Sequence, residues 1–83
     1  MLITISGSVS RLDVIHVVKG TVLEFHIDTF YGEKEVFMVS DVAFRSKFRE
    51  KFNHYESLVG RRLAFKVEYK ANESLELVDS YLI

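Results

Sequence analysis

"TVLEFHIDTFYGEKEVFMV", residues 21–39, decides the fold. Apolar and polar side chains alternate on each side of a central segment that contains Gly32. A period of two is typical of a strand with one buried face, and a glycine between two such runs is typical of a turn. The stretch therefore predicts two neighbouring strands. The residues expected on their inner face are Leu23, Phe25, Ile27, Val36 and Met38.

Three further strands are expected on either side of this pair. Residues 2–9 alternate in the same way, with Gly7 on the apolar side, where a glycine usually marks a bulge or a bend. Residues 63–70 alternate after Gly60, and residues 75–83 follow a polar turn. The inner positions expected in the last two strands are Leu63, Phe65, Val67, Tyr69, Leu75 and Leu77.

A single amphipathic helix is expected between the third and fourth strands. Residues 42–59 space apolar side chains by three or four, and Asp41 precedes them as the N-cap. Such spacing keeps one stripe of a helix apolar over about four turns. The residues expected on the buried stripe are Phe44, Phe48, Phe52, Tyr55 and Val59.

The order of three strands, a helix and two strands covers the whole chain. The segments that carry it are GSV (7–9), KGTVLEFHID (19–28), GEKEVFMV (32–39) and LVGRRLAFKVEYKANESLELVDSYLI (58–83). This order resembles the OB-fold family. The resemblance implies an all-β, single OB-fold domain over residues 1–83, built as a five-stranded barrel with one α-helix between strands 3 and 4. It also implies that the helix closes one end of the barrel.

Composition favours one small domain. The chain has 83 residues, 48% of them hydrophobic, so it can form a core without disulfides, and it contains no cysteine. Its apolar runs are short, and the N-terminal residues lack the pattern of a signal peptide. We therefore expect a cytoplasmic protein without membrane contact.

Charge is unevenly distributed, although the net charge is only −1. Residues 44–70 sum to +5, and the remainder of the chain sums to −6. A charged helix face is often simply a solvated face, but such a basic region can also bind phosphates. Its basic residues are Arg45, Lys47, Arg49, Lys51, Arg61, Arg62, Lys66 and Lys70.

Catalytic and metal-binding patterns are absent from the sequence. The chain has no GxSxG or HExxH motif, so we expect no enzymatic activity, no small-molecule substrate and no cofactor. His16, His26 and His54 fall in three separate segments without a ligand spacing, so we expect no metal site.

Two binding functions remain open, and the first is single-stranded DNA or RNA. In the OB-fold family, the outer face of strands two and three commonly holds unpaired bases on aromatic rings and phosphates on basic side chains. Alternatively, Phe37 is covered by a loop or by the N-terminal strand, and Tyr31 merely packs over the turn. The nearby Glu24, Asp28, Glu33 and Glu35 would also repel phosphate. The residues expected to bind nucleic acid are His26, Phe30, Tyr31, Lys34, Phe37, Arg61, Arg62 and Lys66.

The second function is protein contact through the tip of the first hairpin. Strict alternation leaves at least two of its apolar residues outside the core, and exposed apolar side chains often mark a protein interface. A homodimer or another protein partner would then bind here, unless the loop folds back onto the domain. The interface residues expected are Val14, Ile15, His16, Val17 and Val18.

Overall fold

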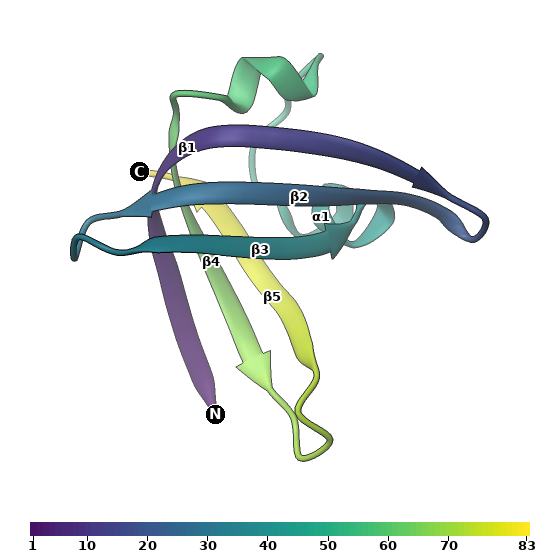
Figure 1. Ribbon diagram of the computed structural model, residues 1–83, viewed down its shortest axis with the longest axis vertical. Coiled ribbons are helices and arrows are strands. Elements are labelled where there is room, and N and C mark those ends of the chain that lie inside the picture. The colour runs from purple at the N-terminus through teal and green to yellow at the C-terminus, as the bar shows by residue number, and fades with distance from the viewer.

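The computed structural model describes residues 1–83 as one mostly β domain (Figure 1). Its elements are β1 (Leu2–Val17), β2 (Gly20–Thr29), β3 (Lys34–Ser40), α1 (Asp41–Lys47), the 3-10 helix η1 (Tyr55–Leu58), β4 (Arg62–Tyr69) and β5 (Leu75–Leu82). The five strands form one antiparallel sheet in the order β3-β2-β1-β4-β5. The expected five strands in sequence order are confirmed. The sheet is not closed, because β3 and β5 are its two edges.

β1 belongs to both halves of the sheet. Its first half pairs with β4, its second half pairs with β2, and Figure 1 shows it bending between them. Gly7 lies at the change of partner, opposite both Thr29 and Leu63. A Cβ atom at Gly7 would lie 2.2 Å from the carbonyl oxygen of Asp28, so only glycine allows the strands to come this close. The register also shifts between Val9 and Arg11, which is a further irregularity of β1.

Aromatic rings connect the two halves of the sheet through one core. Phe25 of β2 is fully buried, and its ring centroid lies 5.0 Å from the rings of both Phe44 of α1 and Phe65 of β4. The inner faces expected for β2 and for residues 63–67 are confirmed. The buried apolar cluster comprises Val9, Leu23, Phe25, Ile27, Phe37, Val39, Phe44, Phe48, Leu58, Leu63, Phe65, Val67 and Leu77.

The expected orientation of β3 is wrong by one residue. Phe37 is buried, with 3% of its surface exposed, whereas Val36 and Met38 are more than half exposed. The reason is the register with β2, which places Phe37 directly opposite the inward Phe25. Directly opposite residues of paired strands point to the same face of a sheet, so Phe37 must point inward. Its ring packs 5.3 Å from that of Phe65.

The expected helix is shorter than predicted and begins one residue earlier. α1 ends at Lys47, and its N-cap is Ser40, whose Oγ accepts a hydrogen bond from the Ala43 amide at 3.1 Å. Phe48 has an extended backbone and forms a bridge with Ser80 of β5. The chain therefore leaves the helix to pair with an edge strand, and only η1 resumes a helical turn.

The aromatic residues expected on one helix stripe still pack together. Phe44 and Phe48 are buried and stack with centroids 4.8 Å apart, and Phe52 and Tyr55 are half-buried against them. Val59, by contrast, is exposed. Aromatic residues spaced by three or four therefore form one cluster here, although they lie on two short helices and the segment between them and not on one long helix.

α1 contacts β2, β3 and β5, beside the opening between the two edge strands, and does not cover the end of a closed barrel. A groove of about 300 Å³ lies between β3, α1 and β5, and six of its nine lining residues are hydrophobic. Its lining residues are Phe37, Met38, Val39, Ser40, Ala43, Lys47, Leu75, Glu76 and Leu77.

The far ends of β4 and β5 extend beyond the core. Leu77 is buried as expected, but Leu75 and Tyr69, which pair with each other, are both exposed. The register shifts beside Val78, because Val67 pairs with Leu77 and Lys66 with Asp79. The burial expected at Leu75 and Tyr69 is wrong, because this pair lies beyond the last buried pair, Val67 and Leu77.

Candidate functional site

The outer surface of the sheet has two halves with different chemistry. The hairpin face consists of the outward side chains of the second half of β1, β2 and β3, namely Arg11, Asp13, Ile15, Val22, Glu24, His26, Asp28, Lys34, Val36 and Met38. The β4 face consists of the outward side chains of the first half of β1, β4 and the end of β5, namely Thr4, Ser6, Ser8, Arg62, Lys66, Asp79 and Tyr81.

His26 lies on the hairpin face, as expected, but it is bound by neighbouring carboxylates. Its Nε2 atom is 2.7 Å from Glu24 Oε1 and 3.8 Å from Asp13 Oδ2, and its side chain is only 29% exposed. Arg11 Nε in turn lies 2.9 Å from Asp13 Oδ2. An imidazole held in such a network offers little free ring surface to a base.

Phe37 is excluded from any stacking surface because it is buried in the core. The outward positions beside it belong to Val36, opposite His26, and to Met38, opposite Glu24. The hairpin face therefore presents aliphatic and acidic groups, and the aromatic pair expected from His26 and Phe37 does not exist there.

Phe30 and Tyr31 form an exposed aromatic corner in the turn between β2 and β3. Their exposed fractions are 55% and 57%. The Phe30 amide donates a hydrogen bond to the Ser6 carbonyl at 3.2 Å, which holds this turn against β1. Arg62 of β4 brings its guanidinium carbon to 5.9 Å from the centroid of the Phe30 ring. The fold thus joins an exposed ring and a cation that are far apart in the sequence.

Lys34 lies at the start of β3, beside this aromatic corner. Its Nζ atom is 3.2 Å from Asp28 Oδ1, and its side chain is highly exposed. Arg61 directly precedes β4 and is exposed, while its carbonyl accepts a hydrogen bond from the Val9 amide at 2.9 Å. Of the eight residues expected to bind nucleic acid, the structure brings Phe30, Tyr31, Lys34, Arg61, Arg62 and Lys66 to exposed or half-exposed positions on or beside the β4 face.

Tyr81 organises the basic groups of the β4 face. It lies opposite Ala64 on β5, and its ring centroid is 4.6 Å from the Arg49 guanidinium carbon and 6.0 Å from Lys66 Nζ. Cations over an aromatic face are attracted by the ring quadrupole. Sequence analysis did not single out Tyr81, although strict alternation from the buried Ser80 places it outward.

Asp79 is the anion of the β4 face, and Arg49 binds it through two hydrogen bonds, the Nε–Oδ1 bond being 3.0 Å long. Hydrogen bonding from Arg49 lowers the pKa of Asp79. The same hydrogen bond raises the pKa of Arg49. One cation of this face is therefore neutralised, which leaves Arg62 and Lys66 as its main positive groups.

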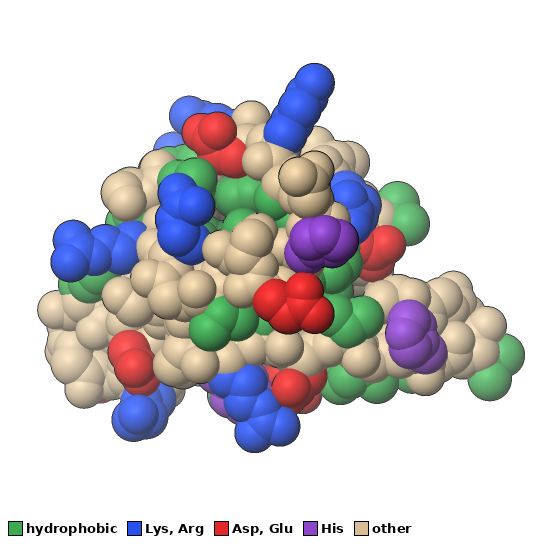
Figure 2. Space-filling view, turned by 90° about the horizontal axis from the view of Figure 1, so that it is seen from above, with side chains coloured by type: hydrophobic (Ala, Val, Ile, Leu, Met, Phe, Trp, Pro, Cys, Tyr) green, Lys and Arg blue, Asp and Glu red, His purple; other side chains and the backbone are tan.

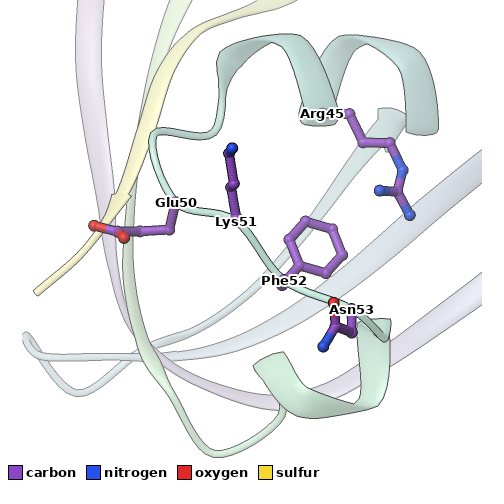
Figure 3. A pocket seen from close by; sticks show the side chains of 5 residues that line it. All are labelled: Arg45, Glu50, Lys51, Phe52 and Asn53. Carbon is purple, nitrogen blue, oxygen red and sulfur yellow. The ribbon is translucent and has the colours of Figure 1, made fainter.

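A second hollow lies between α1 and η1 (Figure 3). It has a volume of about 300 Å³ and is lined by Arg45, Glu50, Lys51, Phe52 and Asn53. The Arg45 guanidinium carbon is 4.9 Å from the ring centroids of both Phe52 and Tyr55, and its Nε is 3.0 Å from Asp41 Oδ1. Arg45 therefore serves the packing of this segment.

The tip of the first hairpin is exposed, as the second expectation requires. Val18 is fully exposed, and Val14 and Val17 are 40% and 49% exposed. Ile15 is half-buried, and His16 Nδ1 lies 3.2 Å from the Thr21 hydroxyl. Figure 1 shows this hairpin extending past the rest of the domain, and Figure 2 shows hydrophobic side chains at its end. The tip does not fold back onto the core.

Comparisons with protein-family models, with curated proteins and with solved structures find no match. No helix in the chain has both the length and the apolar character needed to cross a membrane. The function is therefore inferred from the surface of this chain.

Proposed function

We propose that this chain is an OB-type domain that binds single-stranded nucleic acid through the β4 face and the aromatic corner of Phe30 and Tyr31. One observation carries the proposal, namely that Arg62 lies over the exposed ring of Phe30. Single-stranded nucleic acid combines flat bases with phosphates, so a receptor needs exposed aromatic rings close to cations. The pairing of Phe30 with Arg62 supplies both groups at one place.

The roles of the residues follow from their positions. Phe30 and Tyr31 would stack on bases, because more than half of each residue's surface is exposed. Arg62 and Lys66 lie on the outer side of β4, four residues and about 13 Å apart, so they would contact two separate phosphates of one strand. Arg49 lies on the Tyr81 ring at the end of this track, but its charge is already balanced by Asp79, so it would contribute little to phosphate binding.

The hairpin face is the less favourable half for a polyanion. Asp13, Glu24 and Asp28 lie on it, and carboxylates repel phosphate. The strand would therefore follow β4 and leave β3, in contrast to the path expected from the sequence. Because only a few cations contribute, we expect modest affinity and a shallow dependence on salt.

The experiment is a titration of fluorescent dT and rU oligonucleotides of about ten nucleotides at two salt concentrations. Phe30→Ala should cost roughly 1–3 kcal/mol of binding free energy with little change in salt slope, because stacking does not release counterions. Arg62→Ala should flatten the slope by about one unit. Lys51→Ala, a lysine in the separate hollow of Figure 3, is the matched control and should change little. Absence of binding by the wild-type chain at low salt would refute the proposal.

A second candidate function, self-association or docking onto a protein, is favoured by the exposed tip of the first hairpin. Val18 is fully exposed at the end of a projecting arm, together with Val14 and Val17. Burial of these side chains against another chain would remove apolar surface from water. In sedimentation at high concentration, the wild-type chain should exceed the monomer mass, and the variant with Val17→Ser and Val18→Ser should not. A monomer mass for both proteins would exclude self-association.

A further inference from the structure

Three potential metal ligands meet at the centre of the hairpin face, on the opposite half from the proposed nucleic-acid surface. His26 Nε2, Glu24 Oε1 and Asp13 Oδ2 all lie within 4.8 Å of one another, and the three residues are half-buried. The group combines an imidazole nitrogen with two carboxylate oxygens, so it is not a cluster of carboxylates alone. Divalent transition metals bind such mixed sets of ligands.

The sheet register places these ligands together. Asp13 and Glu24 face each other across β1 and β2, and His26 lies opposite Arg11, one outward position further along β2. The strands beneath them are held by the buried Phe25, so the backbone that carries the ligands is packed on the core. Ligands on rigid neighbouring strands need little reorganisation to bind an ion.

We propose that Asp13, Glu24 and His26 form a binding site for a divalent transition cation such as Zn²⁺. Bonds from zinc to nitrogen and oxygen ligands are about 2.0–2.2 Å long, which separates neighbouring ligand atoms by roughly 3.0–3.5 Å. The observed distances from His26 Nε2, 2.7 Å to Glu24 and 3.8 Å to Asp13, bracket that separation. Small rotations of the side chains therefore suffice, and the remaining coordination positions would be open to water.

Arg11 is the competitor for this site. Its guanidinium lies 2.9 Å from the Asp13 oxygen that would bind the ion, and its side chain is 67% exposed. A cation must displace the guanidinium from Asp13, and the exposed arginine has room to move into solvent. Removing Arg11 should therefore strengthen metal binding, whereas a purely structural ion-pair network would show no saturable metal binding with or without Arg11.

The test uses isothermal titration calorimetry of ZnCl₂ into the full chain at neutral pH. We expect one ion per chain, a loss of at least tenfold in affinity for His26→Gln and for Glu24→Gln, and a gain of several-fold for Arg11→Ala. His16→Gln is the matched control, because His16 lies at the hairpin tip with Thr21 as its partner. Circular dichroism of each variant verifies that the outward substitutions leave the fold intact.

The outcomes separate clearly. Saturable one-to-one binding that is lost with His26 or Glu24 and gained without Arg11 supports the site. Absence of saturable binding to the wild-type chain, binding that persists in His26→Gln but is lost in His16→Gln, or an affinity not raised in Arg11→Ala overturns it. None of these outcomes depends on oligonucleotide binding, because the ligands do not include Phe30 or Arg62.

Discussion

The hairpin face and the β4 face belong to one sheet and share β1, yet their charged side chains have different partners. On the hairpin face, oppositely charged side chains bind each other, as in the ion pairs of Arg11 with Asp13 and of Lys34 with Asp28. On the β4 face, cations lie over aromatic rings: Arg62 lies over Phe30, and Arg49 lies over Tyr81 while it also binds Asp79. The first arrangement suits a small cation, and the second suits a ligand that combines rings and negative charge.

The difference arises within β1, where the strand changes partner at Gly7. Before this residue, the outward side chains are small, as at Thr4 and Ser6, so the long side chains of β4 and β5 dominate the surface. Beyond the register shift between Val9 and Arg11, the outward side chains are larger, and those of Arg11 and Asp13 are charged. One strand can therefore contribute to two chemically distinct surfaces when it pairs with different strands along its length.

The largest expected effect is a loss of stability when a core residue beneath the hairpin face is removed. Phe37→Ala should lower the free energy of unfolding by about 3–5 kcal/mol, because it removes a buried ring that packs against Phe65. Phe30→Ala, an exposed aromatic of the other half, should change stability by roughly 0.5 kcal/mol or less. Urea unfolding of both variants measures the contrast. Equal losses would mean that Phe30 is also a core residue.

A change at the shared strand should affect both faces together. Gly7→Ala places a Cβ atom against the Asp28 carbonyl, so the two strands must separate, at a cost of roughly 1–3 kcal/mol or more. Urea unfolding gives the stability, and titrations with zinc and with oligonucleotide report the two faces. Thr4→Ser, an exposed change on the same strand, is the control. Wild-type stability of Gly7→Ala would show that the strands do not approach so closely.

A smaller effect is expected where the two faces meet. Lys34 is held by Asp28 beside Phe30 and Tyr31, so Asp28→Asn should release its ammonium for phosphate and remove a repelling charge. Because an exposed ion pair is worth about 0.2–1 kcal/mol, oligonucleotide affinity should rise by a factor of about 1.4 to 5. Glu56→Gln in η1 removes the same charge elsewhere and serves as control. Unchanged oligonucleotide affinity in Asp28→Asn would show that Lys34 does not contribute to nucleic-acid binding.

The smallest expected effect concerns the anion of the β4 face. Arg49 lowers the pKa of Asp79 by hydrogen bonding, so ionised Asp79 stabilises the fold above the ordinary pKa of an aspartate. This contribution is lost as the pH falls through the lowered folded-state pKa. Asp79→Asn should therefore destabilise the chain at neutral pH and match the wild type in strong acid, as measured by urea midpoints along a pH series. Arg49→Ala should give the same dependence of the urea midpoint on pH. If the midpoints of variant and wild type differed by a constant amount at every pH, protonation of Asp79 would not be coupled to stability.

The parts of the fold that could be predicted from sequence are those where alternation alone decides burial. Leu23, Phe25 and Ile27 continue one uninterrupted run, so their inward orientation needs no knowledge of the partner strand. β3 could not be oriented in this way, because its register depends on hydrogen bonds across the turn. Thr29 and Glu33 close that turn through both backbone and side-chain hydrogen bonds, and the resulting pairing turns Phe37 inward.

The length of the helix and the neighbours of the surface residues could not be predicted from the sequence, for related reasons. Aromatic spacing between Phe44 and Tyr55 is satisfied equally by one helix and by two short helices packed around a common ring. The exposed residues Phe30, Tyr31 and Arg62 and the half-buried Lys66 could be selected from residue type and position in the sequence, but their neighbours could not. The contacts of Arg62 with Phe30 and of Arg49 with Tyr81 join segments that lie far apart in the sequence, so only the folded sheet reveals them.

The change of partner along β1 also sets an order of assembly. β1 and β2 are joined by a two-residue turn between Val17 and Gly20, and hairpins of this kind form in about 1–10 μs. Pairing of Leu2 with Glu68 must instead close most of the chain into a loop, which costs more conformational entropy and slows folding. The histidine–carboxylate group of the first hairpin should thus exist before the β4 surface does. Pulse-labelled hydrogen exchange should protect β2 amides earlier than those of β4, and simultaneous protection would indicate a single concerted step.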